Sequence, residues 1–144
     1  MPEVSQSTYI KAAPSAVYET LTTAEGWNAW FTDETSVDLN GEIRLRWKSY
    51  GRNGKDIEDG GPVLKAEPGE AFAFQWSPGL VPTTVSFVLE PFREGTLVEL
   101  RETGYSSADR DVAACVDCAA GWGEALTLLK FYMEHGIVCK DDLM

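Results

Sequence analysis

A long amphipathic segment near the end of the chain constrains the fold more than any other feature. From about Asp109 to His135, apolar side chains recur at helical spacing, about 100° per residue. One stripe collects Cys115, Cys118, Trp122, Ala125, Leu126, Leu129 and Met133, and the other side carries Asp117, Glu124, Thr127, Lys130 and Glu134. Gly136 marks the helix end. Such a helix must bury its apolar side against another element, and we expect a sheet.

Short segments with β-strand character fill most of the preceding chain. In residues 42–50, Ile43, Leu45 and Trp47 alternate with charged side chains, and Asn40-Gly41 before them is a hairpin signal. Two short helices are expected at about 14–21 and 24–31, because Pro14 precedes an apolar periodic stretch. We interpret the polar, glycine-rich residues 51–62 as a turn region. Strands are expected at 4–10, 35–39, 42–50, 63–67, 71–76, 84–90 and 96–103.

This order predicts an α+β fold, with a curved antiparallel sheet of about six to seven strands around the long C-terminal helix. A chain of 144 residues is long enough to bury its own core without a disulfide or a metal. The three cysteines form an odd set, and no signal peptide precedes the first expected strand. We expect no apolar run to approach the length needed to span a bilayer. These features predict a cytoplasmic protein.

The net charge of −11 limits the kinds of molecule that the protein is expected to bind. Such a field repels phosphate backbones and anionic lipid surfaces, so neither nucleic acid nor membrane is an expected partner. The charge either keeps the chain in solution or steers a basic protein partner toward it.

Four stretches carry a resemblance to a known family: residues 10–22 with Trp30-Phe31, residues 63–76, residues 84–90 with 95–100, and the Gly-Trp-x-x-x-Leu-x-x-Leu stretch at 121–129. Their order resembles the START-like (SRPBCC) helix-grip superfamily, and more narrowly the activator of heat-shock-90 ATPase homologue (AHSA1-like) branch. The resemblance implies one helix-grip domain over residues 1–144, with a cavity between sheet and C-terminal helix. Related domains hold apolar molecules, act as cyclases or bind a chaperone. Fold alone does not choose among these.

Residues with the chemistry for a metal or catalytic site are sparse. Cys115-x2-Cys118 and His135-x3-Cys139 have zinc-like spacing, but the intervening helix would separate the two pairs by about 25 Å. We therefore expect no metal site and no cofactor. His135, the only histidine, is expected to interact with the helix C-terminus. No spacing among the many carboxylates singles out a catalytic pair, so no catalytic residue is predicted.

Aromatic side chains give the best functional clue. They either fill the core or line a cavity for an apolar ligand. Arg46, Lys48, Gln75 or Tyr50 would orient a ligand only if the strand register turned them inward. The predicted ligand-binding residues are Trp30, Trp47, Phe74, Trp76, Phe87, Trp122, Leu126 and Leu129.

Three function classes follow, in order of preference. The first is a module that binds a small apolar or aromatic ligand between sheet and helix. The second is a chaperone-type protein-interaction module, for which a protein partner or a homodimer stays open. The third is a small cyclase-like or hydrolase-like enzyme, which is less favoured than a protein without catalysis.

Overall fold

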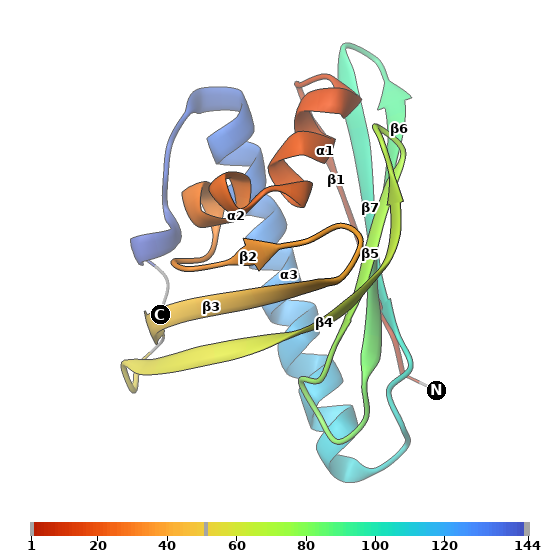
Figure 1. The fold of residues 1–144 in the computed structure, drawn as a ribbon, viewed down its shortest axis with the longest axis vertical. Helices are drawn as coiled ribbons and strands as arrows, with labels where there is room; N and C mark the ends of the chain where they lie inside the picture. The colour runs from red at the N-terminus through yellow and green to blue at the C-terminus, as the bar shows by residue number, and fades with distance from the viewer. Residues whose placement is uncertain (1, 51, 143–144) are drawn as a thin grey trace.

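The computed structural model describes residues 2–50 and 52–142, which form a curved sheet around one long helix (Figure 1). The order of elements agrees with the sequence expectation, with two short helices after the first strand. The elements are β1 (Val4–Ile10), α1 (Pro14–Thr22), α2 (Ala24–Trp30), β2 (Ser36–Val37), β3 (Glu42–Tyr50), β4 (Lys55–Glu67), β5 (Ala71–Trp76), β6 (Thr83–Phe92), β7 (Gly95–Thr103), α3 (Asp109–His135) and the 3-10 turn η1 (Lys140–Asp142).

The seven strands form one antiparallel sheet in the order β1-β7-β6-β5-β4-β3-β2. From β2 to β7, each strand pairs with the next strand in sequence. β1 pairs with β7 instead of with β2. The sheet bends strongly within β4, whose first part pairs with β3 and whose last part pairs with β5. Figure 1 shows β3 running across the direction of β5 to β7. This bend makes the concave side into which α3 packs.

The period-two patterns place the apolar rows on that concave side. Ile43 and Leu45 of β3 are fully buried, and so are Phe72 and Phe74 of β5. Val85, Phe87 and Leu89 of β6 continue the same layer. The predicted α+β helix-grip architecture is therefore confirmed.

The prediction of a turn region at residues 51–62 was wrong for most of that segment, because β4 is a 13-residue strand beginning at Lys55. The glycines of β4 do not form a turn. They lie where the β4 backbone passes very close to the backbones of β3 and β5. A Cβ on Gly60 would lie 2.0 Å from the Ile43 carbonyl oxygen, and one on Gly61 would lie 2.6 Å from the Gln75 carbonyl oxygen. Only glycine allows the strand to pass this closely between its two neighbours.

The bounds of α3 are those predicted, and Gly136 ends the helix in the left-handed conformation (φ 66°). The polar side is less solvated than the pattern implied. Lys130 Nζ reaches the Tyr9 carbonyl oxygen, and Glu134 accepts a hydrogen bond from the Lys11 backbone N–H at 2.9 Å. Leu128, outside the predicted stripe, is also buried. The edge of the helix is therefore tied to the end of β1.

By length and composition, α3 could cross a membrane, contrary to the sequence expectation that no segment reaches that length. In the fold, one side of α3 packs against the sheet, where Ala125 and Leu129 are fully buried. The other side exposes charged residues such as Asp117 and Glu124. About a third (33%) of the most apolar stretch of α3 is buried inside the fold, which is the part that faces the sheet.

Candidate functional site

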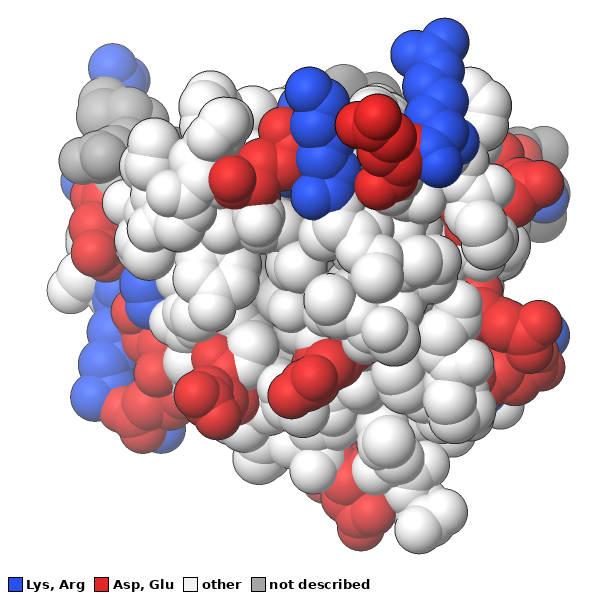
Figure 2. Space-filling view, turned by 90° about the horizontal axis from the view of Figure 1, so that it is seen from above, with Lys and Arg blue, Asp and Glu red and all other residues white. Residues whose placement is uncertain are grey.

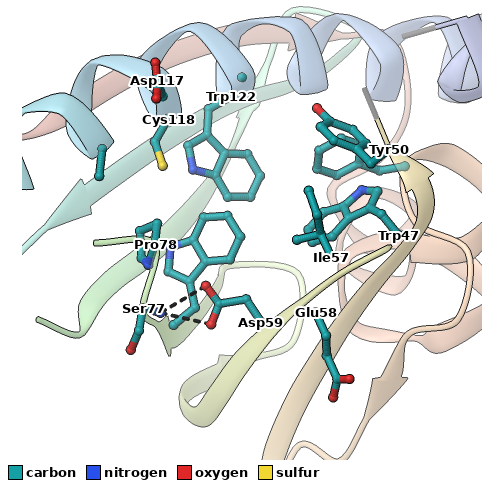
Figure 3. Close-up of a pocket in the computed structure, with 14 residues that line it drawn as sticks. Trp47, Tyr50, Ile57, Glu58, Asp59, Ser77, Pro78, Asp117, Cys118 and Trp122 are labelled. Carbon is teal, nitrogen blue, oxygen red and sulfur yellow. Dashed lines mark hydrogen bonds between the residues drawn. The ribbon is translucent and has the colours of Figure 1, made fainter. Parts of the chain in front are cut away.

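A cavity of about 560 Å³ opens between the first half of α3 and the strands β3, β4 and β5 (Figure 3). Trp122 projects from α3 on one side, and Trp47, Tyr50 and Ile57 project from β3 and β4 on the other. The lining residues are Phe31, Trp47, Tyr50, Ile57, Glu58, Asp59, Trp76, Ser77, Pro78, Ala114, Asp117, Cys118, Gly121 and Trp122. A cavity of this size with aromatic walls has the character of a small-molecule site.

Only part of the predicted ligand-binding set lines this cavity. Trp47, Trp76 and Trp122 do. The other five side chains are buried in the core and absent from the lining: Trp30, Phe74, Phe87, Leu126 and Leu129. They share the inward face predicted for them, but the cavity occupies only the end of the concave side where β3 and β4 diverge from α3.

The sequence-based set missed Phe31, Ile57 and Cys118, which also line the cavity. Phe31 follows the predicted Trp30 by one residue and stacks on it at 5.1 Å between ring centroids. Among the four polar residues considered for orienting a ligand, Tyr50 alone lines the cavity. Arg46 and Lys48 instead pair with Glu34 on the outside of β3.

Behind the cavity wall lies Glu102 of β7, whose side chain is fully buried. Its carboxylate accepts hydrogen bonds from Trp76 Nε1 at 2.7 Å and from Trp122 Nε1 at 3.0 Å. The Thr83 hydroxyl donates a third, at 2.5 Å. Glu102 therefore fixes the orientation of two indole rings that line the cavity. The sequence held a signal for it, because Val98, Leu100 and Glu102 alternate and must share one face.

Glu102 has no basic partner among the described residues, since every ion pair found there joins other groups. A buried carboxylate without a counter-ion relies on hydrogen bonds to offset its lost hydration. Here two indole N–H groups and one hydroxyl supply them.

The thiols near the cavity are poor nucleophiles. Burial raises the pKa of Cys118 to about 12, and burial also raises the pKa of Cys115. A thiolate is the reactive form, so neither cysteine is activated at neutral pH. His135 lies at the exposed end of α3, where its side chain is 57% exposed. In the described part of the chain, no three metal-binding side chains lie close enough to hold an ion.

Asp111, in the first turn of α3, holds the β5–β6 loop at the edge of the cavity. Its buried carboxylate accepts hydrogen bonds from the backbone N–H of Leu80 at 2.6 Å and of Ser106 at 2.9 Å. A Cβ on Gly79 would lie 2.3 Å from Asp111 Oδ1, so the loop approaches the carboxylate as closely as glycine allows. This contact fixes Ser77 and Pro78, which border the cavity.

These contacts predict a pH-dependent effect of Asp111→Asn. The hydrogen bond from the Ser106 hydroxyl, with that from the Leu80 N–H, lowers the pKa of Asp111 below its ordinary 3.8. A lowered folded-state pKa stabilises the fold above the unfolded-state pKa, and this contribution is lost as pH falls through the folded-state value. The stability deficit of Asp111→Asn should stay constant from about pH 7 to about pH 5 and shrink below about pH 4. Urea unfolding across this range measures it, and a deficit independent of pH would contradict the assignment.

A family model described as "Activator of Hsp90 ATPase homolog 1-like protein" matches residues 11–134, which is most of the chain and includes all the lining residues. A search of proteins with curated function returns no match.

Solved structures share the fold over nearly the whole chain. The Aha1 dimer from Colwellia psychrerythraea is 26% identical, with a TM-score of 0.72 over 94% of this chain and 98% of that one. The AHSA1-like protein from Aeromonas hydrophila is 18% identical, with a TM-score of 0.72 over 92% and 96% of the two chains. Protein CV1439 from Chromobacterium violaceum is 17% identical, with a TM-score of 0.77 over 93% and 99%. The last two, given their low identity, support the fold alone.

Proposed function

Because this chain belongs to the family of activator of Hsp90 ATPase homolog 1-like proteins, we propose that it uses the fold in one of the two ways common there, binding a small apolar or aromatic ligand in the cavity between α3 and the sheet. The observation that carries the proposal is the cavity of about 560 Å³ with five aromatic side chains in its lining: Phe31, Trp47, Tyr50, Trp76 and Trp122.

The positions of these aromatic rings support a ligand site. Phe31 and Trp47 are 5.2 Å apart between ring centroids, and Trp76 and Trp122 are 5.4 Å apart. Both pairs pack closely within themselves, yet a space remains between Trp122 and the Trp47 side (Figure 3). Aromatic residues that only filled a core would close such a space, because protein interiors pack to crystal-like density.

Catalysis has little support at this site. The cysteine at the cavity has its pKa raised by burial, and the only histidine of the chain is not among the lining residues. The Glu102 carboxylate is shielded by the two indole rings that it orients. We therefore propose binding without chemistry, in a cytoplasmic single-domain protein.

The test is a titration with Nile red, a neutral dye whose emission rises in apolar surroundings. We expect saturable binding to the unmodified chain, and at least a tenfold weaker Kd for Gly121→Leu. Gly121 lines the cavity, and a Cβ there would meet nothing within 4 Å, so a larger side chain enters the open space.

Ala120→Leu is the matched control, because it adds a larger side chain at the neighbouring, exposed position of the same helix. It should leave Nile red binding unchanged. Equal affinity in Gly121→Leu, or no saturable binding by the unmodified chain, would refute the proposal.

The second candidate is a protein-interaction module, favoured by a different part of the surface. Figure 2 shows a face whose middle is mostly uncharged, with acidic groups just below it and basic groups along the top and left edges. The last turns of α3 and the residues just after it expose Phe131, Ile137 and Val138, which are 43%, 48% and 46% exposed. The Colwellia neighbour was solved as a dimer. Sedimentation of the purified chain as a stable dimer, with no Nile red binding, would support this candidate over the first.

A further inference from the structure

The charged residues that line the proposed ligand cavity all carry the same sign. Glu58, Asp59 and Asp117 are in its lining, and no lysine, arginine or histidine is. Figure 3 shows the carboxylates of Glu58 and Asp117 directed away from the open space. Asp59 is half-buried and accepts hydrogen bonds from the Ser77 N–H at 3.0 and 3.2 Å. Glu58 pairs with Arg44, with 3.6 Å between Arg44 Nε and Glu58 Oε1, so its charge is balanced. Asp59 and Asp117 form no ion pair among the described residues, and these two carboxylates make the cavity margin negative.

A fourth carboxylate reinforces this field from inside. Glu102 is fully buried and receives only neutral hydrogen-bond donors, two of them the indole N–H groups of Trp76 and Trp122. An unbalanced charge in a low-dielectric interior acts strongly on its surroundings. The field of Glu102 therefore reaches the cavity through the two rings that line it.

The aromatic lining favours the same kind of ligand. The face of an indole ring is electronegative and attracts ammonium groups, most strongly where water is excluded. An N–H donated to a carboxylate adds electron density to the ring, which strengthens that attraction. Trp122 packs 5.4 Å from Trp76 and 6.2 Å from Phe31 between ring centroids, so several ring systems surround one end of the cavity.

We infer that the ligand of this cavity carries a positive charge, as an apolar or aromatic molecule bearing an ammonium group that lies against Trp122 and Trp76. The inference rests on the proposed function, since it specifies the ligand of the same site. The net charge of −11 would also concentrate cations near the chain. An uncharged ligand would leave the Glu102 carboxylate without a counter-charge in the bound state as well.

The experiment compares phenyltrimethylammonium with tert-butylbenzene, which has the same shape and no charge. Each is titrated against the complex with Nile red, and calorimetry measures the binding of the ammonium directly. We expect the ammonium to bind about tenfold more tightly, within the range of a desolvated cation–π contact. Benzenesulfonate, an anion of similar size, should not compete.

Two variants that change the net charge equally test whether the preference for the ammonium comes from Glu102. In Glu102→Gln, the preference for the ammonium should fall at least threefold. In Glu99→Gln it should not change, because Glu99 lies on the same strand but is exposed. The comparison on the unmodified chain stands by itself if Glu102→Gln does not fold.

The outcomes separate the two proposals. If Nile red binds but tert-butylbenzene competes as well as the ammonium or better, the cationic ligand is excluded while the ligand cavity stands. If neither Nile red nor the ammonium binds, both proposals are wrong.

Discussion

Replacing Trp122 by alanine is expected to lower the free energy of unfolding by about 3–5 kcal/mol, the usual cost of truncating a large buried aromatic residue. Trp122 is 2% exposed and packs against Phe87 at 5.9 Å as well as against Trp76 and Phe31. The truncation also removes the N–H that Glu102 accepts, which leaves a buried carboxylate with one donor fewer.

Urea unfolding followed by circular dichroism measures this change. Val116→Ala is the control on the same helix, because Val116 is 65% exposed and its truncation should change stability by no more than about 0.5 kcal/mol. A loss below about 1 kcal/mol for Trp122→Ala would match a surface position and contradict the burial of this helix face.

The second large effect is expected at Glu102, where alanine should cost about 3 kcal/mol. The substitution leaves the N–H groups of Trp76 and Trp122 and the Thr83 hydroxyl without their acceptor, at about 1–3 kcal/mol for each buried donor. Removing the carboxylate also recovers the cost of burying a charge. We expect the three unpaired donors to outweigh that recovery, because hydrogen bonds to a charged acceptor are the stronger kind.

Thermal and urea unfolding of Glu102→Ala measure the net change in the free energy of unfolding, with Glu99→Ala as the exposed control. A double-mutant cycle with Trp122→Phe, which keeps an aromatic ring but removes the N–H, measures the interaction energy between Trp122 and Glu102. A coupling energy of about 0.5–3 kcal/mol is expected for directly bonded groups. A Glu102→Ala chain more stable than the unmodified one would show that the buried charge costs more than its hydrogen bonds return.

Much of the fold was predictable because local patterns encode it. The bounds of β1 and α3 match the expectation, and so does the alternation that buries Ile43, Leu45 and Trp47. The segment at 51–62 was misread because glycine usually marks turns. In β4, glycine is needed because a side chain there would clash with the backbone of Ile43 or Gln75, which are distant in sequence.

The candidate site was predictable only in part. Trp47, Trp76 and Trp122 belong to the predicted set and line the cavity, while Trp30, Phe74 and Phe87 are closed into the core. All six point inward, so a period of two or of 3.6 residues cannot separate them. What separates them is where along the concave side the space remains open.

The sequence by itself determined which side chains face the interior, because side-chain direction follows from backbone geometry within a few residues. It also carried the family motifs, now matched over residues 11–134. Only the tertiary structure decided which inward residues border a cavity and that Glu102 lies behind Trp76 and Trp122. Those facts depend on the bend of β4 and on the distance between β3 and α3. Both are set by contacts between segments far apart in the chain, which no local pattern records.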